Sequence, residues 1–285
     1  MIELPQGLAD FAARAGWADA DIQALPGDAS FRRYFRLARE DGASAMLMHA
    51  PPPNEDPAPF LHVAHWLNDH GMRAPAILAE DSGKGWVLTE DFGNHRMRDW
   101  LDANPSHERA AYEAAVDALA ALHRLPPGPF APYDMATYQR EAALLTEWWC
   151  PAQGLAVDLV GYAAAWDEVL VPVLPRQTPG VTVLRDYHAE NIMLLGQQPG
   201  TPQGLIDFQD ALVGHPAYDL VSLLQDARRD VTVDLETAML VHYAQAMGGV
   251  DDDFLADYAR LGAQRNAKIV GIFTRLNARD GKPRY

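Results

Sequence analysis

The pattern of apolar and polar positions divides the chain into a first part rich in strands and a second part rich in helices. Alternating β-branched and aromatic residues predict strands, and apolar residues three and four positions apart predict helices. In the first part we expect strands over 31–37, 45–48, 76–78 and 86–89 and helices over 5–15 and 60–70. In the second part we expect helices over 110–125 (capped by Ser106), 138–149, 155–171, 216–224, 235–247, 254–261 and 264–276. The pattern therefore predicts an α+β protein.

Three oxygen-bearing side chains flank a predicted hairpin in the second part. The apolar runs 192–195 and 205–206 are separated by turn residues, which predicts two antiparallel strands. Asn191 precedes the first strand and Asp207 follows the second, so both are expected at the same end of the hairpin. Asp186 lies in the loop five residues before Asn191.

This set of donors fits phosphoryl transfer. Carboxylate and amide oxygens suit Mg²⁺ that is held jointly by protein and substrate phosphates. The spacing Arg-Asp-x-x-x-x-Asn matches the catalytic loop of protein kinases, in which the Asp accepts the proton of the acceptor hydroxyl and the Asn binds a metal. The alternative is a solvated loop with an Asx turn. The strand predicted from the apolar run 181–184, the loop after it, the hairpin and Asp207 together favour a site.

The residues of this region resemble those of a known superfamily. Arg185-Asp-Tyr-His-Ala-Glu-Asn191, followed by Ile206-Asp-Phe-Gln209, is similar to the signature of the aminoglycoside phosphotransferase and choline kinase superfamily. His188 matches the second His of that signature, and Asp219 matches its downstream structural Asp. The usual first His-Gly pair is replaced by Leu184-Arg185.

The resemblance implies a bilobal protein-kinase-like fold with ATP and Mg²⁺ as cofactors. A small β-rich N-lobe would span 1–92, with a hinge at about 89–93, and a larger, mostly helical C-lobe would span 93–285. It implies Asp186 and His188 as catalytic residues and Asn191 and Asp207 as metal ligands. The implied nucleotide-binding residues are Ser30, Arg32, Arg33, Met48 and Glu90.

The third strand departs from the kinase pattern. Kinases carry a Lys there that binds the nucleotide phosphates, whereas this chain has Met48 at about that position. The three lysines of the chain, at 84, 268 and 282, are elsewhere in the sequence. We therefore expect arginines of the first hairpin to replace it. Strand alternation sends Arg32 and Arg36 to one face of the sheet and Arg33 to the other, without deciding which face meets the nucleotide.

A narrower resemblance covers nearly the whole chain. The segments 27–36, 207–212 and 218–228, with Met48 ahead of a Pro run, resemble bacterial kinases that phosphorylate C1 of N-acetylmuramate and N-acetylglucosamine in peptidoglycan recycling. The first hypothesis is therefore an ATP-dependent anomeric sugar kinase. The second is an aminoglycoside or other small-alcohol kinase. The third, motivated by the absent Lys, is a nucleotide-binding pseudokinase that acts as a scaffold.

The composition of the chain limits the partners and the cellular compartment that we expect. The chain of 285 residues has a formal charge of -16, which disfavours binding to nucleic acid and to anionic membranes. Cys150 is the single cysteine, which excludes an internal disulfide and suits a reducing compartment. The N-terminus has no long apolar run, so we expect no signal peptide. We expect a cytoplasmic monomer whose small-molecule partners are ATP and an amino sugar.

Overall fold

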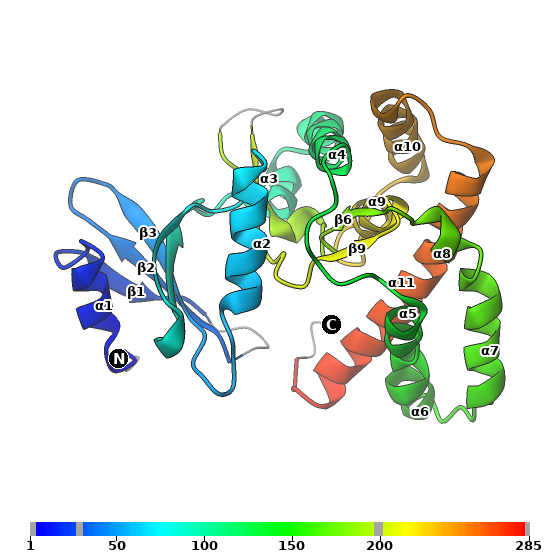
Figure 1. Cartoon of the computed structure of the whole chain (residues 1–285), viewed down its shortest axis with the longest axis horizontal. Helices are drawn as coiled ribbons and strands as arrows, with labels where there is room; N and C mark the ends of the chain where they lie inside the picture. The colour runs from blue at the N-terminus through cyan, green and yellow to red at the C-terminus, as the bar shows by residue number, and fades with distance from the viewer. Residues whose placement is uncertain (1–3, 27–30, 197–201, 283–285) are drawn as a thin grey trace. The chain divides into compact units, whose positions relative to one another are not determined.

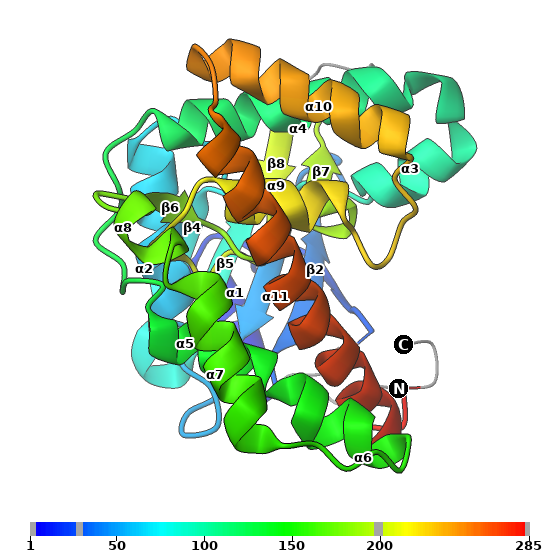
Figure 2. The same cartoon turned by 90° about the vertical axis from the view of Figure 1, so that its right-hand side faces the viewer.

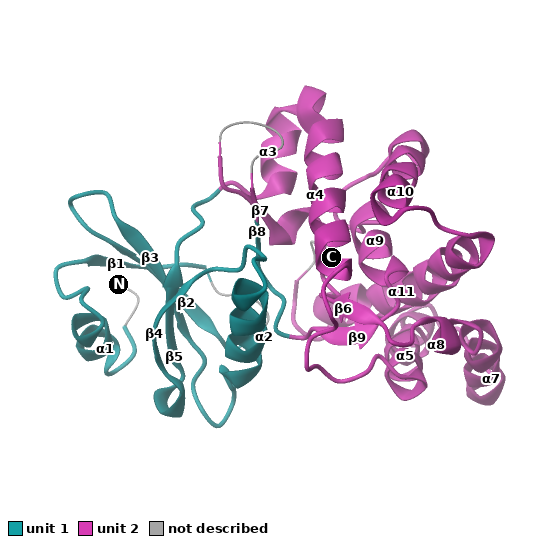
Figure 3. Ribbon diagram, turned by 45° about the horizontal axis from the view of Figure 1, so that its top comes forward, with its two compact units in different colours: residues 1–94, 204–209 teal, residues 95–203, 210–285 magenta. Residues whose placement is uncertain are grey.

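The computed structural model describes residues 4–26, 31–196 and 202–282, and it divides the chain into two compact units. The first unit contains residues 1–94 and 204–209, and the second contains residues 95–203 and 210–285 (Figure 3). The short segment 204–209 therefore belongs to the first unit although it is far from it in sequence.

The first unit is built on an antiparallel sheet, of which Figure 1 labels β1, β2 and β3. Among the described residues this sheet has five strands in the order β1-β2-β3-β5-β4. Strands near the expected positions are confirmed, and Asp21–Ala24 adds an edge strand that the pattern did not predict. This unit also contains two α-helices. The elements are α1 (Leu8–Arg14), β1 (Asp21–Ala24), β2 (Arg33–Ala38), β3 (Ser44–His49), α2 (Ala58–Asp69), β4 (Ile77–Asp81) and β5 (Trp86–Glu90).

Each face of this sheet is covered by one helix. Leu8 and Phe11 of α1 pack on the face that carries Phe35 and Leu47. On the opposite face, Leu61 of α2 belongs to a cluster with the following residues: Met48, Ala50, Val87, Tyr34, Phe60 and Ile77. The strand alternation of side chains thus gives the sheet two separate apolar layers.

The second unit is mostly helical and contains short strands. Strand β6 (Val181–Val183) pairs with β9 (Leu212–Gly214). Strand β7 (Ile192–Leu194) pairs with β8 (Gln203–Leu205), of which Gly204 and Leu205 are assigned to the first unit, and this pairing confirms the expected hairpin. The helices are α3 (Met97–Ala103), α4 (Glu108–His123), α5 (Met135–Ala142), α6 (Cys150–Ala152), α7 (Leu159–Leu170), α8 (Val173–Arg176), α9 (Ala217–Leu224), α10 (Val233–Met247) and α11 (Asp252–Ala278).

Helix α11 crosses much of the second unit and contacts α9, α5 and α7 (Figure 2). The prediction of two helices, 254–261 and 264–276, is wrong because the helix continues through Gly262. A Cβ atom at Gly262 would lie 2.8 Å from the Gln225 side-chain oxygen. The glycine therefore marks a close approach to α9 and not the end of a helix.

Two further expectations for helix ends are wrong. Ser106 does not cap α4, because it lies inside the 3₁₀ turn Pro105–His107 and α4 begins at Glu108. The expected helix over 138–149 is divided into α5 and a π-helix over Leu145–Trp149. Pro151 lies two residues after the π-helix and has no N–H for a regular helical hydrogen bond, which favours the wider turn before it.

No helix in the described ranges combines the length and the apolar character that a membrane crossing requires.

Candidate active site

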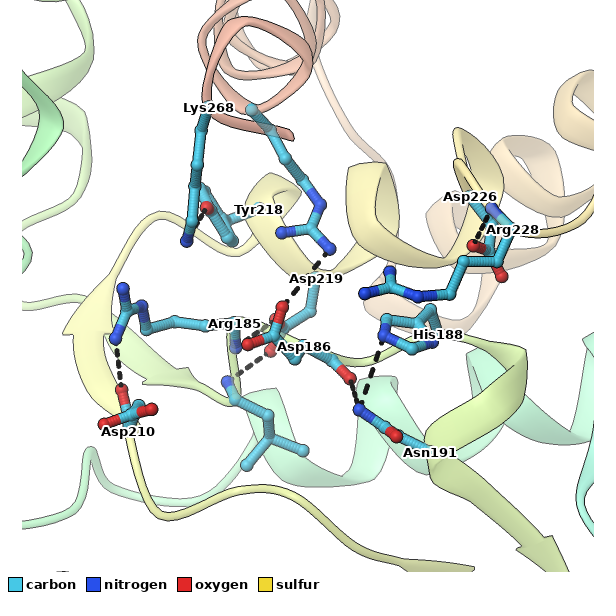
Figure 4. A network of polar contacts seen from close by, with 12 residues as sticks. Arg185, Asp186, His188, Asn191, Asp210, Tyr218, Asp219, Asp226, Arg228 and Lys268 are labelled. Atoms are coloured by element: carbon cyan, nitrogen blue, oxygen red, sulfur yellow. Dashed lines mark hydrogen bonds and ion pairs between the residues drawn. The ribbon is translucent and has the colours of Figure 1, made fainter. Parts of the chain in front are cut away.

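The loop between β6 and β7 carries Asp186 and Asn191, and a buried carboxylate holds its start. Asp219 of α9 accepts hydrogen bonds from the backbone N–H groups of Leu184 at 2.6 Å and Arg185 at 2.8 Å (Figure 4). Burial raises the pKa of Asp219 to about 7 against the opposing effect of these two donors. Arg185 has φ 71°, an uncommon conformation for a bulky residue, and the two hydrogen bonds stabilise it.

The rest of the loop is held through the backbone carbonyl of Asp186. This oxygen accepts hydrogen bonds from the Asn191 side-chain nitrogen at 3.0 Å and from the backbone N–H of His188 at 3.1 Å. The same Asn191 nitrogen lies 3.4 Å from Nε2 of His188. Because the nitrogen makes both contacts, the amide oxygen of Asn191 points in another direction, as a metal ligand would require.

His188 is held as a neutral imidazole. It is buried, and burial together with the positive charge of Arg228 lowers its pKa to about 3. Nε2 therefore accepts the hydrogen bond from Asn191, and Nδ1 carries the proton without an acceptor among the described residues. The structure thus places His188 where it orients Asn191.

Asp186 keeps an accessible and ionised carboxylate. Its side chain is 37% exposed, and Oδ1 lies 3.6 Å from Nη2 of Arg265 on α11. Burial alone would raise the pKa of Asp186, but the positive charges of Lys268 and Arg265 outweigh this effect and hold the pKa below its usual range. An ionised carboxylate at neutral pH suits a base that accepts a hydroxyl proton.

The buried Glu141 of α5 accepts hydrogen bonds from several side chains near the loop. It accepts a hydrogen bond from Nζ of Lys268 at 3.0 Å and also pairs with Arg185 and Tyr133. Burial raises the pKa of Glu141, but Lys268 and Arg185 outweigh burial and hold it below its usual value. Glu141 therefore anchors the cation that directly precedes Asp186 in the chain.

The first unit carries the other proposed metal ligand. Asp207 has φ 61°, and it and Arg185 are the two non-glycine residues with positive φ in the described part of the chain. Its Oδ1 accepts a hydrogen bond from the Gln209 side chain at 2.9 Å. The next residue, Phe208, stacks on Phe60 of α2 with a centroid distance of 5.2 Å. This contact of the buried Phe208 with the partly buried Phe60 fixes the backbone beside Asp207.

The sheet decides which arginine of the first hairpin shares a face with Asp207. Tyr34 pairs in register with Met48. Burial raises the pKa of Tyr34, the charge of Arg32 lowers it and the charge of Asp207 raises it, so both charged groups lie near Tyr34. Arg32 forms an ion pair with Glu55 at 3.2 Å on this face. Arg33 lies on the opposite face, which α1 covers, and its guanidinium contacts the Phe35 ring. Burial lowers the pKa of His49 on this face, and the positive charge of Arg33 lowers it further.

The structure therefore brings Arg32, Met48 and Asp207 together and leaves Arg33 apart from them. Met48 is buried with Leu61 and Val87, so an apolar contact occupies the position at which the resemblance led us to expect the kinase Lys. Ser30 lies outside the described residues.

The expected hinge is held by two ion pairs of the first unit. Glu90 pairs with Arg73 through both carboxylate oxygens, one of them at 2.7 Å, and accepts from the backbone N–H of Ala76 at 3.4 Å. Arg36 pairs with Asp91 at 2.6 Å. The Glu90 side chain thus binds Arg73, its backbone N–H donates to the Ala76 carbonyl at 2.9 Å, and its carbonyl oxygen accepts from the Thr89 hydroxyl at 3.1 Å.

Several residues of the site were missed at the level of the sequence. The sequence indicated Tyr34 only weakly: it lies two positions after Arg32 and therefore on the same face of an extended segment. Arg265 and Lys268 are one helical turn apart in an otherwise amphipathic helix, a spacing that is also common on solvated helix faces. Their burial, to 2% and 5% exposure, separates them from ordinary surface cations.

The donor set fits Mg²⁺ that is shared with phosphate. Asn191 offers an amide oxygen and Asp207 a carboxylate, both hard oxygen ligands. Within the described ranges, no group of three or more His, Cys, Asp or Glu side chains is arranged to hold a metal. A metal bound by either of these residues would therefore need further oxygens, such as those of a substrate phosphate.

Comparison with known proteins places the chain in a class. A model of the phosphotransferase enzyme family matches residues 21–262, so the chain belongs to this family. Its fold is the protein-kinase-like fold of that family. The aminoglycoside phosphotransferase APH(3'')-Id from Streptomyces rimosus, in complex with ADP and streptomycin, has a TM-score of 0.64 at 20% identity, covering 93% of this chain and 99% of its own.

Two relatives narrow the class further. A Pseudomonas aeruginosa protein named N-acetylmuramate/N-acetylglucosamine kinase is 37% identical over 95% of this chain and 82% of its own length. A Caulobacter vibrioides protein of the same name is 35% identical over 97% of this chain and 87% of its own length.

Proposed function

We propose that the protein is an ATP-dependent sugar kinase that phosphorylates the anomeric hydroxyl of N-acetylmuramate and N-acetylglucosamine during cell-wall recycling. The observation that carries this proposal is the similarity along nearly the whole chain to relatives of that name. The geometry of the catalytic loop agrees with the chemistry. We further propose that residues 1–92 act as the nucleotide-binding lobe and residues 93–285 as the acceptor lobe.

Asp186 would act as the base. The acceptor oxygen attacks the γ-phosphorus, a new O–P bond forms, the bond to the β-phosphate oxygen breaks, and ADP leaves. Asp186 takes the hydroxyl proton and holds the oxygen in line with the phosphorus. An anomeric hydroxyl belongs to a hemiacetal and is more acidic than an ordinary alcohol, so one ionised carboxylate is adequate for it.

Asn191 and Asp207 would hold Mg²⁺, which neutralises charge on the nucleotide phosphates when it is bound. The orientation of the Asn191 amide supports its part in this proposal, since His188 and the Asp186 carbonyl occupy the amide nitrogen. His188 would contribute by holding this orientation as a neutral imidazole.

On the nucleotide side, Arg32 and Tyr34 would replace the missing Lys. They share the sheet face of Asp207 and Met48, and the tyrosine hydroxyl and the guanidinium are both hydrogen-bond donors that suit phosphate oxygens. The backbone carbonyl of Glu90, which can accept a second hydrogen bond, would contact the nucleotide base.

The charge around the catalytic loop favours a neutral or anionic acceptor over a polycationic one. Arg185, Arg265 and Lys268 surround the region of Asp186 and Glu141. An aminoglycoside would need a dense cluster of carboxylates to bind its ammonium groups. A sugar with an N-acetyl group needs amide and hydroxyl partners, and a lactyl carboxylate would be compatible with the nearby cations.

The test is a panel of acceptors incubated with ATP and Mg²⁺ and assayed for ADP. We expect turnover of N-acetylmuramate or N-acetylglucosamine, with a ³¹P NMR signal that identifies a glycosyl 1-phosphate. Kanamycin-type aminoglycosides and choline are the competing acceptors. Rapid turnover of one of these, with neither N-acetyl sugar used, would refute the sugar assignment, and failure of every acceptor would favour the pseudokinase.

A further inference from the structure

We propose that Arg265, on α11, is a positioning residue that orients the Asp186 carboxylate toward the acceptor hydroxyl. The inference rests on the proposed function, because the role of Asp186 is part of that proposal. Arg265 lies 79 positions after Asp186 in the chain, outside the signature segments that indicate the site. Only the packing of α11 brings the two side chains within 3.6 Å of each other.

The backbone and the side chain of Asp186 have different partners. Its carbonyl oxygen is fixed by Asn191 and His188, and the N–H groups of the two preceding residues are fixed by Asp219. None of these contacts determines the rotation of the carboxylate. Within the described ranges, the cation that reaches the carboxylate within 4 Å is Arg265, through Nη2 and Oδ1.

The two sides of this ion pair differ in exposure. The Arg265 side chain is 3% exposed, whereas the Asp186 side chain is 37% exposed. The guanidinium therefore contacts the carboxylate from the interior, and the accessible side of the carboxylate remains available to an acceptor. Such an arrangement restricts the rotation of the carboxylate without covering it.

The remaining nitrogens of Arg265 argue against a purely structural role. Nε and Nη1 are buried and make no hydrogen bond of standard geometry within the described part of the chain, and the polar group nearest to the guanidinium besides Asp186 is the Tyr218 hydroxyl. The guanidinium carbon lies 5.6 Å from the ring centroid of Tyr218, so the cation rests on an aromatic ring. A buried guanidinium with unmet donors is costly for stability. Its position is understandable if it is retained for its contact with Asp186.

Residues one turn before and one turn after Arg265 on α11 help to place it against Asp186. Gly262, one turn before Arg265, lies against the side chain of Gln225, the residue that caps α9, so this part of α11 packs beside the end of α9. Lys268, one turn after Arg265, donates to Glu141 at 3.0 Å and to Tyr218 at 3.4 Å. Lys268 thus hydrogen-bonds Glu141 and acts on Asp186 through its charge, whereas Arg265 is the residue that contacts the Asp186 carboxylate.

The consequence should appear in turnover and not in nucleotide binding. If the carboxylate rotates, the acceptor oxygen loses its alignment with the γ-phosphorus, and a misplacement of about 1 Å costs on the order of 100-fold. We expect Arg265→Met to lower kcat by about 10- to 100-fold with an unchanged KM for ATP. Arg265→Lys restores the charge without the planar fork and should be intermediate.

The experiment is a double-mutant cycle in the full-length protein. It compares wild type, Arg265→Met, Asp186→Asn and the double variant, with Arg275→Met as a control on the same helix. If Arg265 acts through Asp186, the double variant loses no more kcat than Asp186→Asn alone. An additive loss, or a normal kcat in Arg265→Met, would overturn the inference.

Two further measurements distinguish a folding defect, or a wrong assignment of the base, from a failure of the inference about Arg265. Thermal unfolding and ATP affinity are measured for every variant, and the cycle is repeated with Arg265→Lys in case the Met variant does not fold. Equal losses of kcat, ATP affinity and stability in both Arg265 variants would show a structural role and contradict the inference. A normal kcat in Asp186→Asn would instead remove the proposed base itself.

Discussion

Oδ1 of Asp219 accepts the backbone N–H of Arg185 at 2.8 Å and thereby holds a non-glycine residue at φ 71° directly before Asp186. The second carboxylate oxygen accepts the N–H of Leu184. One buried side chain on α9 thus fixes the backbone from which the proposed base projects. The contact joins the stability of the fold to the geometry of the candidate site.

Replacement of the Asp219 carboxylate should lower both the stability of the fold and the activity of the site. In Asp219→Asn, one of the two backbone donors faces an amide N–H₂ group and loses its acceptor, which costs about 1–3 kcal/mol. We expect a lower urea midpoint and a fall in kcat. Asp134→Asn is the matched control, because Asp134 caps α5 by accepting from Thr137 and Asn caps helices equally well. A wild-type midpoint in Asp219→Asn would contradict this account.

The Asp186→Asn variant should lose turnover but not nucleotide affinity. The amide cannot accept the proton, and general-base and positioning effects are worth about 10²–10⁴-fold. We expect kcat to fall within this range while the Kd for ATP in the presence of Mg²⁺ changes little. Steady-state kinetics and calorimetry measure the two quantities separately. A kcat near that of wild type would show that Asp186 is not the base.

Removal of a proposed metal ligand should change the dependence on magnesium. Asp207→Ala deletes a carboxylate oxygen, so we expect activity to vanish or to require a much higher Mg²⁺ concentration. Asp210→Ala is the control, because the Arg185 side chain contacts the backbone oxygen of Asp210 and this contact survives the substitution. Titration of Mg²⁺ in the activity assay gives the comparison. Wild-type activity after EDTA treatment would exclude a metal role.

The two neighbouring arginines of the first hairpin should behave differently. Arg32→Gln removes a cation from the sheet face of Asp207, and we expect the KM for ATP to rise severalfold or more. Arg33→Gln removes a cation from the α1-covered face, and we expect little change. Initial rates at varied ATP test both variants. Equal effects of the two substitutions would show that the sheet face does not select the phosphate-binding arginine.

Stability should fall as pH falls, in part because of His123. Burial, with a smaller contribution from His215, lowers the pKa of His123 to about 3, against about 6.5 in an unfolded chain. Below pH 6.5 the unfolded state takes up a proton that the folded state does not, so this contribution to stability is complete above pH 6.5 and is lost toward pH 3. Between pH 7 and pH 5 the loss from this group is about 2 kcal/mol.

The comparison uses His123→Asn, which keeps a polar partner for the Tyr243 hydroxyl that lies 2.8 Å from Nδ1. Urea unfolding is followed from pH 7 to pH 5 for both proteins. Wild type should lose about 2 kcal/mol more than the variant over this range, because only wild type contains the titrating imidazole. Parallel stability profiles would show that His123 does not titrate as described.

The sequence by itself determined what depends on local chemistry. Alternation predicted the strands around Phe35 and Leu47, and helical spacing predicted α9 and α10 within a few residues. The order of Asp186, Asn191 and Asp207 indicated phosphoryl transfer, because the residue types that serve this chemistry are few and their spacing along a loop and hairpin is fixed by backbone geometry.

Tertiary structure decided what depends on packing between distant segments. Alternation alone separated Arg32 from Arg33, but only the positions of α1 and α2 on the sheet showed which of them shares a face with Met48. The contact of Arg265 with Asp186 likewise has no local signal, because a basic residue in an amphipathic helix is ordinarily solvated. Its burial follows from the path of α11 across α9, which the whole core of the second unit determines.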